Sequence, residues 1–183
     1  MSVFTNPAAG APGQAEQYIE AILGLLGDRD PVMVLRATPQ VVRDGVNGLS
    51  AEQLGTREAP GKWSVRHVVQ HLADSELVWG YRVRMILAHD RPQLTGYDQD
   101  LWATRLGYEQ SDVEATLDLF RVLRETNLAL LDRVPASDLQ RVAVHAERGE
   151  ESVERMLRLN AGHDLLHLHE IDRIKTAIGA GAR

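Results

Sequence analysis

The chain has 183 residues, of which 44% are apolar and 25% charged, and its formal net charge is −6. A chain of this length can bury a substantial core. Its mild acidity disfavours nucleic acid or an anionic membrane as a partner, because both attract basic surfaces. The sequence has no cysteine, which excludes disulfides, thiolate metal sites and a cysteine nucleophile.

The N-terminal sequence has no basic region followed by an apolar stretch, so it does not resemble a signal peptide. No apolar run reaches the roughly 18–20 residues that a membrane span requires. We therefore expect a cytoplasmic protein. Residues 1–13 are rich in Ala, Gly and Pro, and we expect them to be disordered. Residues 14–183 are expected to form a single helical domain.

The first part of that domain reads as a broken helical arm. Residues 14–26 have helical periodicity, and Asp30-Pro31 predicts a short helical turn. Thr38-Pro39 predicts the start of a separate helix, because proline suits the first helical turn. Ser50 is expected to cap one further turn.

Two long helices follow. Ser64 is a suitable N-cap for the first, which is expected to extend to about Ala88. Its inward positions recur at steps of three and four: Val65, Val68, Leu72, Ser75, Trp79, Val83 and Ile86. Residues 93–107 read as a loop with a short helix. Ser111 is then expected to cap the second long helix, with Glu114 completing a capping box.

The last helix is predicted to begin at residues 150–152 and to end near Ile178. The segment RVAVHA, residues 141–146, is the one alternating strand candidate, and it is short. The expected fold is therefore all-α: a four-helix bundle with a broken N-terminal helical arm and short connecting helices.

The last helix carries histidines on its apolar face. His163 and His167 are four residues apart, so both project from that face on successive turns. An unpaired buried polar group costs about 1–3 kcal/mol, and a divalent metal would be a partner for both rings. The first long helix offers His71 as a third ligand, with His67 one turn earlier. Three histidines suit Zn²⁺, Ni²⁺ or Fe²⁺ and leave coordination positions open for catalysis.

Acidic residues lie close to these histidines in the sequence. Their carboxylates are candidates for orienting the ring N–H groups: Asp74, Glu76, Asp164 and Glu170. A competing interpretation makes the histidines hydrogen-bonded core residues without a metal, since two histidines four apart on a helix are more often not ligands. The remaining histidines are expected at the surface: His89, His145 and His169.

Three segments together resemble the DinB-like superfamily, a group of DNA-damage-inducible-protein-like four-helix bundles that includes bacillithiol- and mycothiol-dependent transferases. They are APGKWSVRHVVQHLADSE at residues 59–76, YDQD at 97–100 and AGHDLLHLHEI at 161–171. The resemblance covers nearly the whole chain and implies one divalent metal ion held by His71, His163 and His167. Zinc is the first expectation, with nickel and iron as alternatives. His67 stands where many relatives have Glu, and Glu170 replaces a common Gln; either side chain would then lie near the site.

The resemblance also implies a function. The metal would activate a low-molecular-weight thiol, as in a thiol S-transferase, or a water, as in a hydrolase, for attack on a small-molecule substrate. In the hydrolytic version Glu76, Asp74 or Asp98 is a candidate base. The alternative is a non-catalytic, stress-related bundle that binds a metal or a small ligand. The resemblance further implies that the chain can form a homodimer. The arginines of the chain are scattered along the sequence, which disfavours nucleic acid as a partner.

Overall fold

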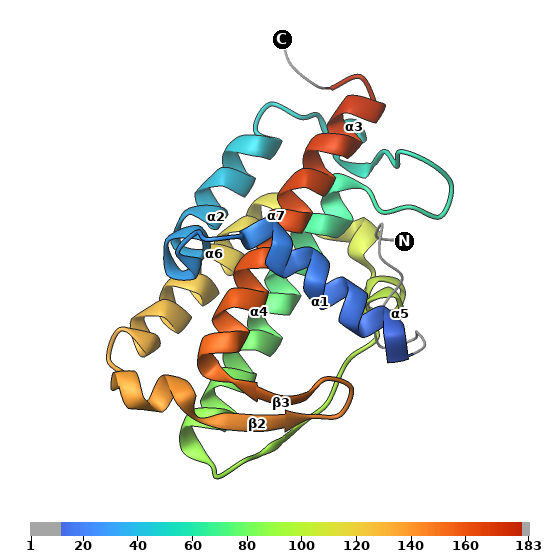
Figure 1. The fold of residues 1–183 in the computed structure, drawn as a ribbon. Coiled ribbons are helices and arrows are strands. Elements are labelled where there is room, and N and C mark those ends of the chain that lie inside the picture. The colour runs from blue at the N-terminus through green and yellow to red at the C-terminus, as the bar shows by residue number, and fades with distance from the viewer. Residues whose placement is uncertain (1–11, 181–183) are drawn as a thin grey trace.

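The computed structural model describes residues 12–180 and has four helices arranged as a closed bundle (Figure 1). These are α2 (Pro31–Val46), α4 (Val65–Ala88), α6 (Val113–Leu131) and α7 (Val153–Ala177). α4 packs between α6 and α7, and α2 packs between the same two helices on the other side. An additional helix, α1 (Pro12–Leu26), crosses the outside of α7. The predicted four-helix bundle is therefore confirmed.

Short helices connect these elements. They are α3 (Ala51–Gly55), α5 (Gln99–Arg105) and the 3-10 turns η2 (Tyr108–Gln110) and η3 (Ala136–Gln140). Ser50 caps α3, as predicted, and Gln53 completes a capping box with it. Most of the N-terminal segment that was expected to be disordered lies outside the described residues, and its last two residues, Pro12 and Gly13, begin α1.

The predicted break before Pro39 is wrong, because α2 continues through this proline. Proline has no N–H, so it leaves the carbonyl oxygen four residues earlier without its helical donor. Here that oxygen belongs to Leu35, and it accepts a hydrogen bond of 2.6 Å from Nη1 of the buried Arg124. A long-range contact thus replaces the missing helical bond, and the helix is preserved.

Two predicted helix caps also differ. Ser64 precedes α4, but its hydroxyl contacts Nδ1 of His67 at 2.8 Å and makes no capping bond to the backbone. α6 is capped by Asp112, whose side chain accepts a hydrogen bond from the backbone N–H of Ala115. The Ser111 hydroxyl instead donates a hydrogen bond to the backbone carbonyl oxygen of Tyr108. Serine and aspartate compete for such positions, and the local sequence does not decide between neighbours.

A small sheet lies at one end of the bundle. β1 (Gln93–Leu94) pairs in parallel with β2 (Val142–His145), and β2 pairs antiparallel with β3 (Gly149–Ser152). The sequence indicated only the middle strand and assigned residues 150–152 to the last helix. His145, which was expected at the surface, is only 1% exposed, because the alternation of β2 places it on the inner face beside Ala143. His89 and His169 are exposed, as expected.

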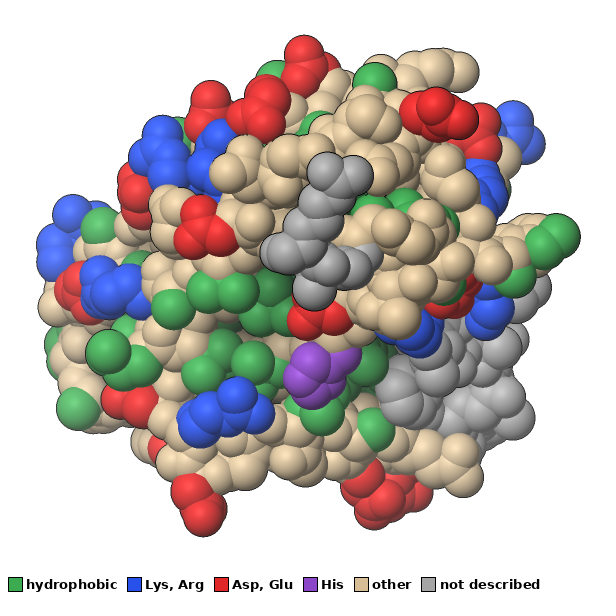
Figure 2. All heavy atoms as spheres, turned by 90° about the horizontal axis from the view of Figure 1, so that it is seen from above, with side chains coloured by type: hydrophobic (Ala, Val, Ile, Leu, Met, Phe, Trp, Pro, Cys, Tyr) green, Lys and Arg blue, Asp and Glu red, His purple; other side chains and the backbone are tan. Residues whose placement is uncertain are grey.

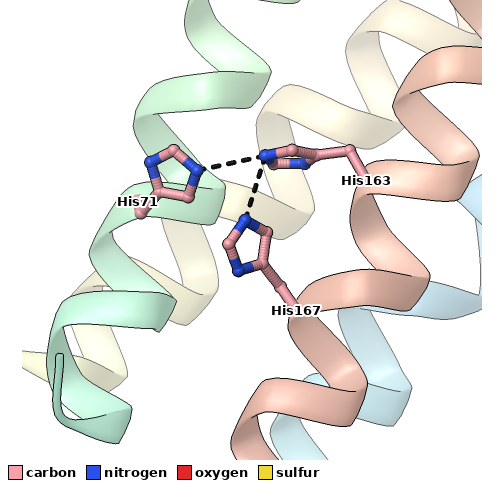
Figure 3. A group of neighbouring side chains, drawn as sticks. All are labelled: His71, His163 and His167. Carbon is pink, nitrogen blue, oxygen red and sulfur yellow. Dashed lines mark hydrogen bonds between the residues drawn. The ribbon is translucent and has the colours of Figure 1, made fainter. Parts of the chain in front are cut away.

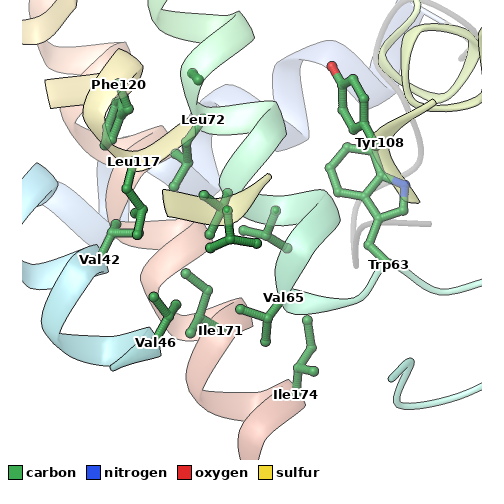
Figure 4. Packing of buried hydrophobic residues seen from close by; sticks show 14 of the residues in the cluster. Val42, Val46, Trp63, Val65, Leu72, Tyr108, Leu117, Phe120, Ile171 and Ile174 are labelled. Atoms are coloured by element: carbon green, nitrogen blue, oxygen red, sulfur yellow. The ribbon is translucent and has the colours of Figure 1, made fainter. Parts of the chain in front are cut away.

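Buried apolar side chains from all four bundle helices fill the interior. Figure 4 shows Val42 and Val46 of α2 facing Leu117 of α6 and Ile171 of α7. Trp63, just before α4, is also buried in this core (Figure 4), and its ring contacts those of His71 and His167. Among residues 12–180, no helix has the length and apolar character needed to cross a membrane. On the face in Figure 2, acidic and basic side chains are interspersed.

Candidate metal centre

Three histidine rings converge between α4 and α7 (Figure 3). His71 comes from α4, and His163 and His167 come from successive turns of α7. Nε2 of His163 lies 3.0 Å from Nε2 of His71 and 3.1 Å from Nε2 of His167. These are the three histidines selected from the sequence. Among the His, Asp and Glu residues of the described range 12–180, these three histidines have donor atoms close enough together to share a metal ion.

The spacing of these nitrogens fits a transition-metal ion. Metal–nitrogen bonds of about 2.0–2.1 Å place two ligand nitrogens about 2.9 Å apart at a right angle and about 3.4 Å apart in a tetrahedron. The observed separations, 3.0 and 3.1 Å, fall within that range. Without an ion, three ring nitrogens would face one another with few protons to share. The donor set therefore fits a divalent metal.

Glu170 controls the protonation of one ring. Its Oε2 lies 2.8 Å from Nδ1 of His167, and both residues are buried. A carboxylate only accepts hydrogen bonds here, so His167 donates from Nδ1 and keeps a lone pair on Nε2. This is the contact expected of an acidic residue next to a ligand. Nδ1 of His71 and Nδ1 of His163 have no hydrogen-bond partner among the described residues.

The electrostatic surroundings keep two of the rings neutral. Burial, followed by the nearby rings, lowers the pKa of His71 well below its ordinary value. Burial and His167 do the same to the pKa of His163. Metal ligation requires deprotonated imidazoles, so both rings are prepared for it at neutral pH. Trp63 closes the site from one side, with its ring 5.0 Å from that of His71.

A cavity of about 150 Å³ opens beside this cluster. His71 and His163 line it, whereas His167 is buried behind them. The other walls come from α1, from the loop after β1 and from the β2–β3 turn, with Tyr18, Tyr97 and Arg148 among them. Gly162 permits the close approach of α1, because a Cβ here would lie 2.2 Å from the carbonyl oxygen of Ile22.

Two hydroxyl groups connect the cavity to the histidines. The Ser75 hydroxyl lies 3.3 Å from Nε2 of His71 and 2.7 Å from the Tyr97 hydroxyl. Burial raises the pKa of Tyr97, so its phenol stays protonated at neutral pH. Sequence analysis did not identify either residue as part of the site. Ser75 on the inward stripe and Tyr97 in YDQD were the available signals.

Two of the suggested bases have other hydrogen-bond partners. Asp74 accepts from the Tyr108 hydroxyl at 2.5 Å and from the side-chain amide of Gln70 at 3.2 Å. Asp98 caps α5 by accepting from the backbone N–H groups of residues 100 and 101. Neither residue lines the cavity beside the histidines. We therefore assign neither of them as the base.

Glu76 and Asp164 belong to a separate buried network around Arg124. The guanidinium donates to Glu76 at 2.8–2.9 Å and contacts both oxygens of Asp164, at 2.8 and 3.2 Å. The amide groups of Asn127 and Asn160 also donate to Glu76. The expectation that Asp164 or Glu76 orients a histidine ring is wrong, because the arginine from α6 binds both carboxylates.

His67 is not part of the group of three converging rings. Its Nε2 accepts from Arg57 at 3.2 Å, so Nδ1 carries the proton toward Ser64. Burial and the positive charge of Arg57 lower its pKa to about 4. It lines a second cavity of about 400 Å³ together with Arg57 and Trp63. His67 therefore does not line the cavity next to the proposed ligands.

Comparison with known proteins gives the class to which this fold and site belong. The DinB superfamily model matches residues 35–171, which include all three histidines. The chain belongs to the DinB superfamily.

Several curated relatives are named as proposed metal-dependent hydrolases. One from Oceanobacillus iheyensis is 31% identical over 133 residues, covering 73% of this chain and 77% of the relative. Another from Bacillus licheniformis is 28% identical over 180 residues, covering 98% and 95%. The solved structure of YfiT from Bacillus subtilis matches with a TM-score of 0.75 at 24% identity. YfiT is described as a proposed metal-dependent hydrolase with an unusual four-helix bundle topology. That match covers 93% of this chain and 91% of YfiT, and it shows the shared fold.

Proposed function

We propose that this protein is a divalent-metal-dependent hydrolase of small molecules, with the metal held by His71, His163 and His167. The observation that carries the proposal is the convergence of three Nε2 atoms beside a cavity that two of the rings line. The names of the curated relatives support the choice of hydrolysis. When bound, the metal would supply Lewis acidity and make a water nucleophilic near neutral pH. Zinc is the first choice, because three neutral imidazoles and an open position are a catalytic zinc set.

The protein's own residues have distinct roles in this proposal. Glu170 fixes the tautomer and the orientation of His167 through the contact at Nδ1. The hydroxyl groups of Ser75 and Tyr97 lie on the cavity side of His71. They are placed to donate hydrogen bonds to a substrate oxygen that gains negative charge during hydrolysis. Trp63 and the apolar cavity wall limit the access of bulk water.

Elemental analysis and ester hydrolysis test this function together. We expect purified wild type to hold about one equivalent of zinc, nickel or iron and to hydrolyse p-nitrophenyl acetate. The double variant His163→Ala/His167→Ala should lose both properties while keeping its helical circular dichroism. His169→Ala, an exposed histidine on the same helix, is the matched control and should change neither.

Other results would exclude hydrolysis. If wild type stays metal-free after incubation with these ions, or the double variant hydrolyses the ester at the wild-type rate, the proposal is wrong. If the metal is bound but only transfer of a low-molecular-weight thiol to an electrophile is found, the protein is a thiol transferase. Bound metal with neither activity would favour the non-catalytic alternative.

A further inference from the structure

One face of α4 presents a series of different groups to the cavity. His71, Ser75 and Arg82 all line it, and Val78 and Trp79 lie between the last two. Their spacing of three and four residues keeps them on one side of the helix. At 1.5 Å per residue, the Cα atoms of His71 and Arg82 are about 16 Å apart along the axis. The cavity therefore runs from the histidines toward a guanidinium.

Arg82 has no carboxylate in contact. Within residues 12–180 it forms no ion pair, and its Nη2 donates a hydrogen bond to the carbonyl oxygen of Thr95 at 2.5 Å. The other cavity arginine, Arg148, is already neutralised, because it donates to both oxygens of Glu151 at 2.6 and 2.8 Å. A half-buried guanidinium without a contacting anion is costly. Arg82 is thus available to pair with a ligand.

The charges around Arg82 support this conclusion. Burial, followed by the positive charge of Arg148, lowers the pKa of Arg82, and Tyr97, Glu151 and Glu147 oppose the shift. Glu147 also lines the cavity, but its carboxylate packs over Gly96, where a Cβ would lie 2.3 Å from Oε1. The nearby acidic groups therefore offset the charge of Arg82 only from a distance. A carboxylate entering the cavity would contact it directly.

We propose that this cavity binds a small organic molecule with a terminal carboxylate, which pairs with Arg82. Placing the bond to be cleaved at the histidine end rests on the proposed function. The cavity of about 150 Å³ has room for roughly ten water molecules, which limits the ligand to a small molecule. Ile22, Val78 and Leu159 provide apolar wall for its middle part. A guanidinium fork matches a carboxylate, and a single unpaired arginine suits a monoanion.

Hexanoate and hexanamide test the inference, because they have the same size and differ in charge. Isothermal titration calorimetry on the zinc-loaded protein should show tighter binding of hexanoate. Arg82→Gln should weaken hexanoate binding about 10- to 100-fold, the effect of losing a hydrogen bond to a charged group, and should leave hexanamide unchanged. Arg82→Lys should keep part of the preference. Arg121→Gln, which removes an exposed arginine on α6, is the control and should have no effect.

Equal binding of hexanoate by Arg82→Gln and wild type would overturn the inference, since the carboxylate would then bind elsewhere, for example at the metal. Equal binding of hexanoate and hexanamide by wild type would do the same. If Arg82→Gln does not fold, the comparison moves to His163→Ala/His167→Ala, in which the preference for hexanoate should persist without the metal. Binding that depends on Arg82 without ester hydrolysis would refute the hydrolase and keep the carboxylate site. Hydrolysis together with binding that ignores Arg82 would refute only the carboxylate site.

Discussion

Replacement of Arg124 by methionine should be among the most destabilising substitutions in the bundle. Arg124 is 1% exposed and pairs with two carboxylates, Glu76 and Asp164, that are themselves 1% exposed. Methionine fills similar space but leaves both acids without their cation. Loss of Arg124 also removes the hydrogen-bond donor to the Leu35 carbonyl oxygen, because Pro39 has no N–H with which to form the usual helical bond. Arg124 therefore stabilises three separate buried acceptors.

The expected magnitude follows from these contacts. Breaking a buried ion pair by removing one partner costs about 3–5 kcal/mol, and an unsatisfied buried carbonyl adds about 1–3 kcal/mol. Relaxation and water entry overlap between these effects, so we expect a total loss of about 4 kcal/mol. For a chain of this size, that corresponds to a fall of roughly 8–16 °C in Tm. Burial already raises the pKa of Glu76 in the wild type. Without Arg124 the deficit should shrink as the pH falls toward the ordinary carboxyl range, where Glu76 becomes neutral.

Urea unfolding followed by circular dichroism measures this loss. A chelator in all samples removes any contribution from metal binding. Arg121→Met is the matched control, because Arg121 lies one turn earlier on α6 and forms an exposed i,i+4 pair with Glu125. It should cost less than about 1 kcal/mol. If Arg124→Met also lost less than about 1 kcal/mol, the network would not stabilise the fold as argued.

Three further predictions concern the site and its surroundings. Gly162→Ala should lower Tm by several degrees and displace α1, because its Cβ would collide with the backbone of Ile22; an unchanged Tm would contradict this packing. Glu170→Gln should weaken metal affinity about 10- to 100-fold in a chelator competition, through loss of the carboxylate at His167; wild-type affinity would exclude this role. Burial, followed by Arg148, lowers the pKa of His145 to about 4, so the unfolded chain takes up its proton first as the pH falls from about 6.5. The stability that neutral His145 contributes is thus complete above about pH 6.5 and is lost toward pH 4, so the urea midpoint of the wild type should fall over this range. His145→Gln should make that fall less steep, and an equally steep fall in the variant would refute the assignment.

The sequence predicted α1, α4, α6 and α7 and the three converging histidines, because helix periodicity is a local property, but it divided α2 at Pro39. An apolar residue every three or four positions places His163 and His167 on the face that contains the core. The same periodicity places His71 on the inward side of α4. Capping residues indicated some element ends, as Ser50 does for α3, whereas Pro39 suggested a helix start that the structure does not have.

Only the tertiary structure decided which buried groups pair with one another. Asp164 and Glu170 flank the same histidines in the sequence, yet Asp164 bonds to Arg124 of α6 and Glu170 to His167. The choice depends on which neighbouring helix faces each side chain, and the periodicity of a single helix does not specify that. The continuity of α2 through Pro39 depends on the same arginine. The cavity is a further example, since Tyr18, Tyr97 and Arg148 come from distant segments that become neighbours only when α1, the loop and the β2–β3 turn pack against the bundle.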